Sequence, residues 1–172
     1  VRPDQWGLAT PCEKWTVKDL ADHVLGGNRF SLPLLAGGSA AQALGIAQGA
    51  FDRALAYVKE RQQFGKRIAD FQVTQHKLAD MATKIELARL MTYKAAWNYD
   101  QGRIDPKLTS MAKMYAARTA VEVADEAIQL LGGYGYMEEY PIARAFRDAR
   151  VQRIYGGTNE IMKEIVGRSL GF

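Results

Sequence analysis

Cysteine and histidine are scarce in this sequence, and their scarcity excludes several kinds of chemistry. Cys12 is the one cysteine among 172 residues, so no intramolecular disulfide can form, and a reducing, cytoplasmic setting is expected. No histidine lies close to it in the sequence, so we expect an unreactive thiol. The two histidines, His23 and His76, belong to separate predicted helices, and no cysteine pair or His-Glu-x-x-His motif accompanies them. The sequence therefore predicts no metal site.

Long runs of like charge and long apolar runs are absent as well. The net charge of +4 comes from basic residues mixed with acidic ones, a distribution that does not indicate a nucleic-acid surface. Residues 30–51 carry no charge over a length that could span a bilayer. Glycines, glutamines and Pro33 make this segment only weakly hydrophobic, so we expect a loop and a buried helix there instead of a membrane span.

Helical patterns dominate the rest of the sequence, and their ends are marked. Near the N-terminus, Thr16 can cap a helix that stops at Gly26–Gly27. The residues from there to Ser39 are typical of a loop, because glycine and proline interrupt them. Asp105 and Pro106 suit the N-cap and the first position of a long helix.

Three long stretches show the periodicity of amphipathic helices. Apolar residues recur every three or four positions over residues 39–61, 74–97 and 105–131. The residues expected to face inward are Leu44, Ala47, Phe51, Leu55 and Val58, then Leu78, Met81, Ala82, Ile85 and Ala88, then Leu108, Met111, Tyr115, Ala117, Val121, Ala124, Ile128 and Leu131. Shorter helices are expected after Pro141 and over residues 158–170. Because alternating strand patterns are absent, the sequence predicts an all-α fold, an antiparallel four-helix bundle with an N-terminal helical extension.

Two glycine pairs border predicted helices and are candidates for ligand contact. Gly132–Gly133 ends the longest helix, and Gly156–Gly157 precedes the last one. Glycine beside a helix end lets a ligand approach the main chain, and a helix start offers unpaired N–H groups to a phosphate or a polarised carbonyl. An ordinary C-cap for the first pair, and a turn with Thr158 as N-cap for the second, would explain the same residues. Arg61, close to Phe64, is either a phosphate-binding cation or a solvated helix end.

Three segments, "ERQQFGKRIADFQ", "QLLGGYGY" and "YGGTNEI", together and in this order resemble the C-terminal helical domain of the acyl-CoA dehydrogenase family. The resemblance covers residues 39–172 and implies a four-helix bundle that pairs with itself, as a homodimer or homotetramer, and contributes half of an FAD site. The residues that it assigns to FAD are Arg61, Phe64 and Gln72, facing the flavin nucleotide of a neighbouring subunit, Gln129, Gly132 and Gly133, facing the adenosine diphosphate part, and Thr158 and Glu160 beside the last helix. Tyr155 and Gly157 match the loop that lies against the acyl thioester.

The same resemblance implies a reaction and exposes a gap in it. The family removes an α-proton and a β-hydride from an acyl-CoA to form a trans-2-enoyl-CoA, as in fatty acid metabolism. The proton goes to a glutamate whose two usual positions match Gly156 and Leu35 here, so no catalytic residue is identified. The helical domain and the β-domain that precede this one in the family are not matched either.

Two functions follow from this resemblance. The first is an impaired acyl-CoA dehydrogenase-like flavoprotein that acts on an acyl-CoA thioester, with an electron-transfer flavoprotein as a candidate partner. The second is a non-catalytic, oligomerising helical bundle in which the family motifs persist.

The first part of the chain has a different resemblance. "CEKWTVKDLADHV", within residues 4–37, is similar to the opening of the mycothiol-dependent maleylpyruvate isomerase and DinB-like family. There the histidine that matches His23 is a metal ligand, but its two partners have no counterpart here, so His23 is expected to be structural or solvated. A metal-dependent thiol transferase is therefore a third and weaker hypothesis. The two resemblances predict a boundary near Gly38, between segments 1–38 and 39–172.

Overall fold

The computed structural model describes the backbone of residues 32–172 and the side chains of residues 38–172. The predictions for Cys12, for His23 and for the helix capped by Thr16 lie outside the described residues. The boundary near Gly38 also stays a prediction.

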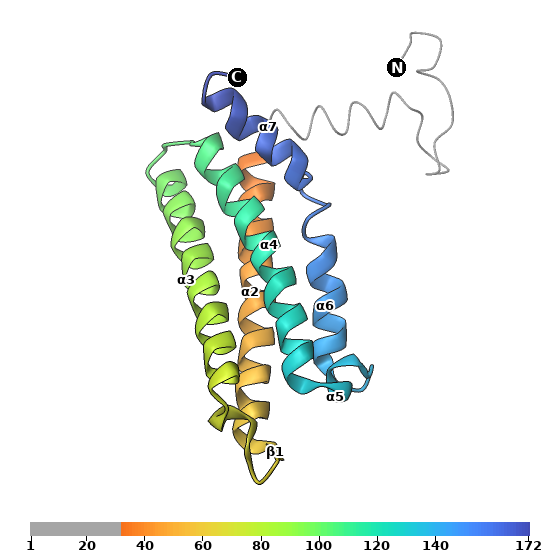
Figure 1. Ribbon diagram of the computed structural model, residues 1–172. Coiled ribbons are helices and arrows are strands. Elements are labelled where there is room, and N and C mark those ends of the chain that lie inside the picture. Colours follow the sequence, from red (N-terminus) through yellow and green to blue (C-terminus); the bar gives the residue numbers. More distant parts are fainter. Residues whose placement is uncertain (1–31) are drawn as a thin grey trace, which may run out of the picture.

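Long helices that run alternately in opposite directions form the body of the molecule (Figure 1). Three of them follow one another in antiparallel succession, and two shorter helices together occupy the fourth position of the bundle. The α-helices are α2 (Leu32–Glu60), α3 (Gln72–Asp100), α4 (Pro106–Leu131), α5 (Gly133–Tyr136), α6 (Pro141–Val151) and α7 (Asn159–Ser169). This arrangement confirms the predicted all-α, antiparallel bundle.

A small β-hairpin and a 3-10 turn connect α2 to α3. This connection contains β1 (Gln62–Gln63), its antiparallel partner β2 (Lys66–Arg67) and η2 (Ile68–Asp70). Phe64 and Gly65 form the turn with φ angles of 54° and 77°, and a type I′ turn requires two such positive values. The guanidinium of Arg67 donates hydrogen bonds of 2.8 and 3.1 Å to the carboxylate of Asp70 and lowers the pKa of that carboxyl. The sequence patterns did not predict this hairpin.

α4 lies at the centre of the bundle and packs against α2, α3, α6 and α7. Its most buried side chains are largely alanine, and so are those of α2. Alanines with at most 1% of their surface exposed are Ala40, Ala43, Ala47, Ala50 and Ala54 in α2, and Ala112, Ala116, Ala117, Ala120, Ala124 and Ala127 in α4. The distance between packed helices depends on the side chains at the contact, so these small residues let α4 approach its neighbours closely. Larger residues such as Met81 and Ile85 of α3 complete the core.

Two polar residues begin helices, and one glycine ends a helix, at the positions that the sequence predicted. The carboxylate of Asp105 accepts a 3.0 Å hydrogen bond from the N–H of Leu108, and the hydroxyl of Thr158 accepts one of 3.3 Å from the N–H of Ile161. Gly132 ends α4 with a φ of 62°. These three helix ends are confirmed as predicted.

The expected loop before Ser39 is wrong from Leu32 onward, because α2 already begins there. Proline is accommodated in the first turn of a helix, since its missing N–H would have no partner there, and Pro33 is the second residue of α2. The helix then continues through Gly37 and Gly38, whose intrinsic cost of about 1 kcal/mol each is small enough for packing to override. No helix in the described part of the chain has the length and hydropathy needed to cross a membrane.

The predicted inward face of α3 is also wrong at one position. Ala82 is exposed, whereas Thr74, Met81, Ile85, Ala88 and Thr92 are buried. Only a narrow stripe of this helix faces the bundle. Ala82 follows Met81 directly and is therefore turned about 100° away from that stripe.

The alanine-lined core should not tolerate larger side chains at its centre. Ala120→Leu adds three carbons at a position with 0% exposure, so we expect the free energy of unfolding to fall by about 1–3 kcal/mol. Ala82→Leu makes the same change at an exposed site of a neighbouring helix and should shift it by less than about 0.5 kcal/mol. Urea unfolding followed by circular dichroism measures both values. Equal effects of the two variants would contradict the packing described above.

Candidate functional site

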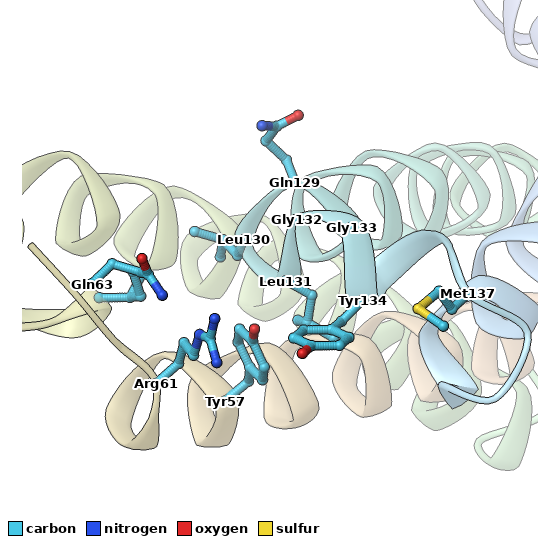
Figure 2. Close-up of a pocket in the computed structure, with 11 residues that line it drawn as sticks. Tyr57, Arg61, Gln63, Gln129, Leu130, Leu131, Gly132, Gly133, Tyr134 and Met137 are labelled. Carbon is cyan, nitrogen blue, oxygen red and sulfur yellow. The ribbon is translucent and has the colours of Figure 1, made fainter.

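An open groove of about 500 Å³ lies where the C-terminal ends of α2 and α4 come together (Figure 2). It is lined by Tyr57, Arg61, Gln63, Ile68, Gln129, Leu130, Leu131, Gly132, Gly133, Tyr134 and Met137. Four of the residues predicted to contact FAD, namely Arg61, Gln129, Gly132 and Gly133, are among them. The fold therefore brings together two motifs that are separated by some seventy positions in the sequence.

Arg61 supplies the positive charge of this groove. It follows the last residue of α2, and its own N–H still donates a 2.8 Å hydrogen bond to the carbonyl of Tyr57, which fixes the start of the side chain. Its guanidinium carbon lies 5.6 Å from the ring centroid of Tyr134, within cation–π range. No carboxylate of the described residues pairs with Arg61. Its hydrogen-bond donors are thus available to a ligand.

The glycines after α4 serve different purposes. Gly132 adopts a positive φ that few other residues tolerate. At Gly135 an added Cβ would lie 2.6 Å from the carbonyl oxygen of Ile128, so close packing requires glycine there. Gly133 has neither constraint: its φ is not positive, and an added Cβ would meet nothing within 4 Å. The packing of the described chain leaves the glycine at position 133 unexplained.

Aromatic residues that sequence reasoning missed form one side of the groove. The ring of Tyr134 lies edge-on to Tyr57, with centroids 6.5 Å apart, and 5.2 Å from the ring of Tyr140. The run "YGYMEEY" after the glycine pair was the available signal for this aromatic group. The side chain of Gln129 points away from Arg61 and Tyr134 in Figure 2, so it borders the groove without closing it.

Phe64, in the hairpin turn, and Gln72, at the start of α3, were also predicted to contact FAD, but neither residue lines the groove. Phe64 sits at the tip of the hairpin with 91% of its surface exposed. Its ring contacts Phe71 edge-on at a centroid distance of 6.4 Å. A non-glycine residue with positive φ costs about 1–2 kcal/mol, so the exposed ring is held out at an energetic cost. Gln72 is exposed as the first residue of α3.

The remaining predicted residues lie in the loop between α6 and α7 and, for Glu160, in the first turn of α7, far along the bundle from β1 (Figure 1). The Tyr155 hydroxyl donates a 2.7 Å hydrogen bond to the side-chain oxygen of Gln42 in α2. Gly156 and Gly157 follow with φ angles of 64° and 90°, so the chain turns through two left-handed residues before Thr158. Glu160 is exposed in the first turn of α7. Within one chain, Thr158, Glu160 and the loop residues Tyr155 and Gly157 therefore lie in a separate region from Arg61 (Figure 1).

Beneath this loop lies a lysine that sequence reasoning missed. Lys113 of α4 has no exposed surface, and its ammonium donates hydrogen bonds to the carbonyl of Gly157 at 2.5 Å and to the side-chain oxygen of Asn159 at 3.2 Å. Burial lowers the pKa of Lys113 to about 8, although the nearby Glu160 acts to raise it. Its position three residues before Ala116, on the buried face of a helical pattern, was the signal that could have identified it.

No metal-binding cluster is present in the described residues. No group of three or more histidine, cysteine, aspartate or glutamate side chains comes together there, and His76 is an exposed residue of α3. The groove at the ends of α2 and α4 offers a guanidinium, aromatic rings and bare main chain, groups that suit an anionic ligand with an aromatic part.

Comparison with known proteins relates these features to one family. Residues 32–171 match the family model for the acyl-CoA dehydrogenase C-terminal domain. Cyclohexane-1-carbonyl-CoA dehydrogenase of Geobacter metallireducens is 48% identical over 130 residues, which are 76% of this chain and 34% of that protein. Subunit CarC of the caffeyl-CoA reductase-Etf complex of Acetobacterium woodii is 48% identical over 133 residues, 77% of this chain and 35% of that protein.

A solved structure agrees with the sequence matches. Butyryl-CoA dehydrogenase from Megasphaera elsdenii superimposes with a TM-score of 0.78 at 47% identity, over 78% of this chain and 35% of that one. The chain thus spans about a third of the length of the curated relatives that it matches. Its helical fold, its groove motifs and these matches show that the chain belongs to the acyl-CoA dehydrogenase family, as a C-terminal domain.

Proposed function

We propose that this chain forms the helical half of an FAD site in an acyl-CoA dehydrogenase-like flavoprotein that acts on an acyl-CoA thioester. The observation that carries the proposal is the groove that both Arg61 and the glycine pair Gly132–Gly133 line. An arginine fork binds phosphate oxygens in pairs, and a glycine without a side chain lets a phosphate or ribose lie against the main chain.

The electrostatics of the groove explain why Arg61 matters most there. α2 ends at Glu60 and α4 ends at Leu131, so both helices direct the negative ends of their dipoles toward the groove. A pyrophosphate would be repelled by these ends, and Arg61, unpaired within the described residues, provides the compensating charge. The residues present fit the adenosine diphosphate part of FAD, with the ring of Tyr134 beside the guanidinium.

The separation of the two groups of candidate residues favours a site shared between copies of the chain. Arg61 and the hairpin lie toward one end of the bundle, and Thr158 and Glu160 lie beside the loop before α7 (Figure 1). A homodimer or homotetramer would bring the first group of one copy to the second group of another. The ring of Phe64, exposed at the hairpin tip, would reach across such an interface.

The loop from Tyr155 to Thr158 would support the acyl thioester. FAD, when bound, supplies the acceptor for the hydride that leaves the β-carbon of the acyl group. The chain's own contribution is to present main chain at Gly156 and Gly157, where no side chain intervenes, and to exclude water from that surface. The general base is the missing element, because the two positions at which the family carries this glutamate hold Gly156 and Leu35 in this chain. We therefore infer that the chain binds its ligands and is impaired in proton abstraction.

The names of the relatives suggest the ligand class and a partner. Cyclohexane-1-carbonyl-CoA dehydrogenase and butyryl-CoA dehydrogenase are both named for acyl-CoA thioesters, which suggests that class for this chain without fixing the acyl group. The relative from Acetobacterium woodii belongs to a complex named with Etf. An electron-transfer flavoprotein is accordingly the electron acceptor that we propose.

A non-catalytic oligomerising bundle is the second candidate function. One observation favours it: α3 exposes a row of large apolar residues at helical spacing. These are Leu87, Leu90, Tyr93 and Trp97, with exposed fractions between 48% and 63%. A colourless protein that forms dimers or tetramers and gains no thermal stability from FAD would favour this alternative.

The groove predicts that Gly133 serves the ligand and not the fold. Purified chain should be yellow, release flavin on heating and melt at a higher temperature with FAD. Gly133→Ala should leave the free energy of unfolding of the apoprotein within about 0.5 kcal/mol and weaken FAD binding by about tenfold or more, because the added Cβ occupies the open surface. Fluorescence titration of FAD gives the Kd of each variant.

Gly135→Ala is the contrasting variant. It should lower the stability of the apoprotein by about 1–3 kcal/mol, since its Cβ meets the main chain of Ile128. Wild-type FAD affinity in Gly133→Ala would contradict the assignment of the groove.

A substitution at the hairpin tip should change FAD affinity much more than it changes the free energy of unfolding. Phe64→Asn relieves about 1 kcal/mol of strain, since Asn-Gly suits a type I′ turn, and loses a contact with Phe71 of similar size. The free energy of unfolding should therefore change by less than about 1 kcal/mol, while FAD affinity falls by about tenfold if the ring reaches a partner's flavin. Fluorescence titration and light scattering check both. A Phe64→Asn variant that binds FAD as tightly as wild type would exclude this role.

A further inference from the structure

Lys113 is the charged side chain without exposed surface among the described residues, and the proposed function gives it no task. We propose that Lys113 is a positioning residue that fixes the main chain of residues 155–158 through its hydrogen bond to the Gly157 carbonyl. What this loop binds rests on the proposed function. How the loop is held does not, because the contact lies within the chain itself.

The hydrogen bond sets the orientation of a whole peptide unit. The peptide bonds of the described residues are trans, so the carbonyl of Gly157 and the N–H of Thr158 point in opposite directions from one plane. The carbonyl points inward to Lys113, 2.5 Å from the ammonium nitrogen. The N–H of Thr158 is therefore turned away from the buried lysine.

Two consecutive glycines make such an anchor necessary. Gly156 and Gly157 both populate left-handed conformations freely, and an unanchored pair would sample many arrangements. Tyr155 ties one side of the loop to Gln42 of α2, and Lys113 ties the other side to α4. The N–H of Asn159 also donates a 3.1 Å hydrogen bond to the carbonyl of Arg153, which closes the loop at its base. Lys113 is the side chain that holds the carbonyl of Gly157 within this frame.

The surroundings of Lys113 are built for this contact. Asn159, which is buried at the start of α7, accepts a hydrogen bond from Lys113 and donates one of 3.5 Å to the carbonyl of Met114. Glu160 of α7 is the charged group that acts on the titration of Lys113 among the described residues. A buried ammonium is costly to desolvate, so a fully buried lysine with these partners indicates a role beyond packing.

The pH dependence of unfolding gives a first test. In the folded chain Lys113 loses its proton near pH 8, whereas in the unfolded chain it does so near its ordinary value of 10.5. Between these values the unfolded chain binds more protons, so Lys113 makes the folded state more stable as pH rises. Relative to Lys113→Met, the unfolding equilibrium constant of the wild type should fall by up to about tenfold per pH unit in this window. A pH-independent ratio would contradict the buried contact.

Carbon-detected NMR of the full chain tests the positioning directly. The carbonyl resonance of Gly157 should shift with a midpoint near pH 8 in the wild type, because its donor titrates. Lys113→Met should abolish that midpoint. Lys113→Arg should still hold the loop but show no midpoint near pH 8, since arginine keeps its proton. Lys84→Met is the matched control: Lys84 pairs with Glu122 at 2.7 Å on a half-exposed surface, and its loss should leave the midpoint unchanged.

FAD titration then connects the loop to the site. Lys113→Met should bind FAD about tenfold more weakly, and Lys113→Arg within about threefold of wild type. A Gly157 resonance that does not respond to pH in the wild type, or a midpoint that survives in Lys113→Met, overturns the proposal. Unchanged FAD affinity in a Lys113→Met variant that has lost the midpoint contradicts the assignment of this loop to the FAD site, which belongs to the proposed function. If the wild type binds no FAD, the proposed function fails, and the wild-type carbonyl titration alone still decides whether Lys113 positions the loop.

Discussion

Close packing around α4 is the constraint on which the rest of the structure depends. This helix has neighbours on most of its surface, and alanine at Ala116, Ala120 and Ala124 allows them to come close. Small side chains bury little apolar area each, so stability comes from many close contacts spread over several helices. The ends of α4 are consequently fixed in space. The C-terminal end of α4 leads into Gly132 and Gly133, which line the groove with Arg61. Its N-terminal half carries Lys113, which lies under the loop before α7.

This arrangement divides the candidate site into two parts within one chain. The groove offers a guanidinium, an aromatic ring and an open glycine, which suit the nucleotide part of a dinucleotide. The loop offers two glycines held between Tyr155 and Lys113, which suit a flat group lying on the main chain. The two parts are separate within the described chain, which spans about a third of the length of the curated relatives that it matches. Under the proposed function, an interface between copies of the chain would join the two parts.

The sequence predicted those features that depend on local chemistry. Asp105 and Thr158 cap helices because their side-chain oxygens reach the next turn, and Gly132 ends α4 because of its φ. The prediction failed where neighbours in space decide: helix α2 continues back to Leu32 although proline and glycine suggested a loop, and Ala82 is exposed because α3 shows the core only a narrow face. The groove was predicted only in its motif residues, since the aromatic side formed by Tyr57 and Tyr134 depends on tertiary packing.

A crystal structure of the chain with FAD would test the central claim most directly, because it locates both parts of the site at once. The account predicts the pyrophosphate beside Arg61 and Gly133 of one copy, with the flavin end toward the Thr158 loop of a second copy. FAD bound away from the Arg61 groove, or held entirely within one copy, would contradict it.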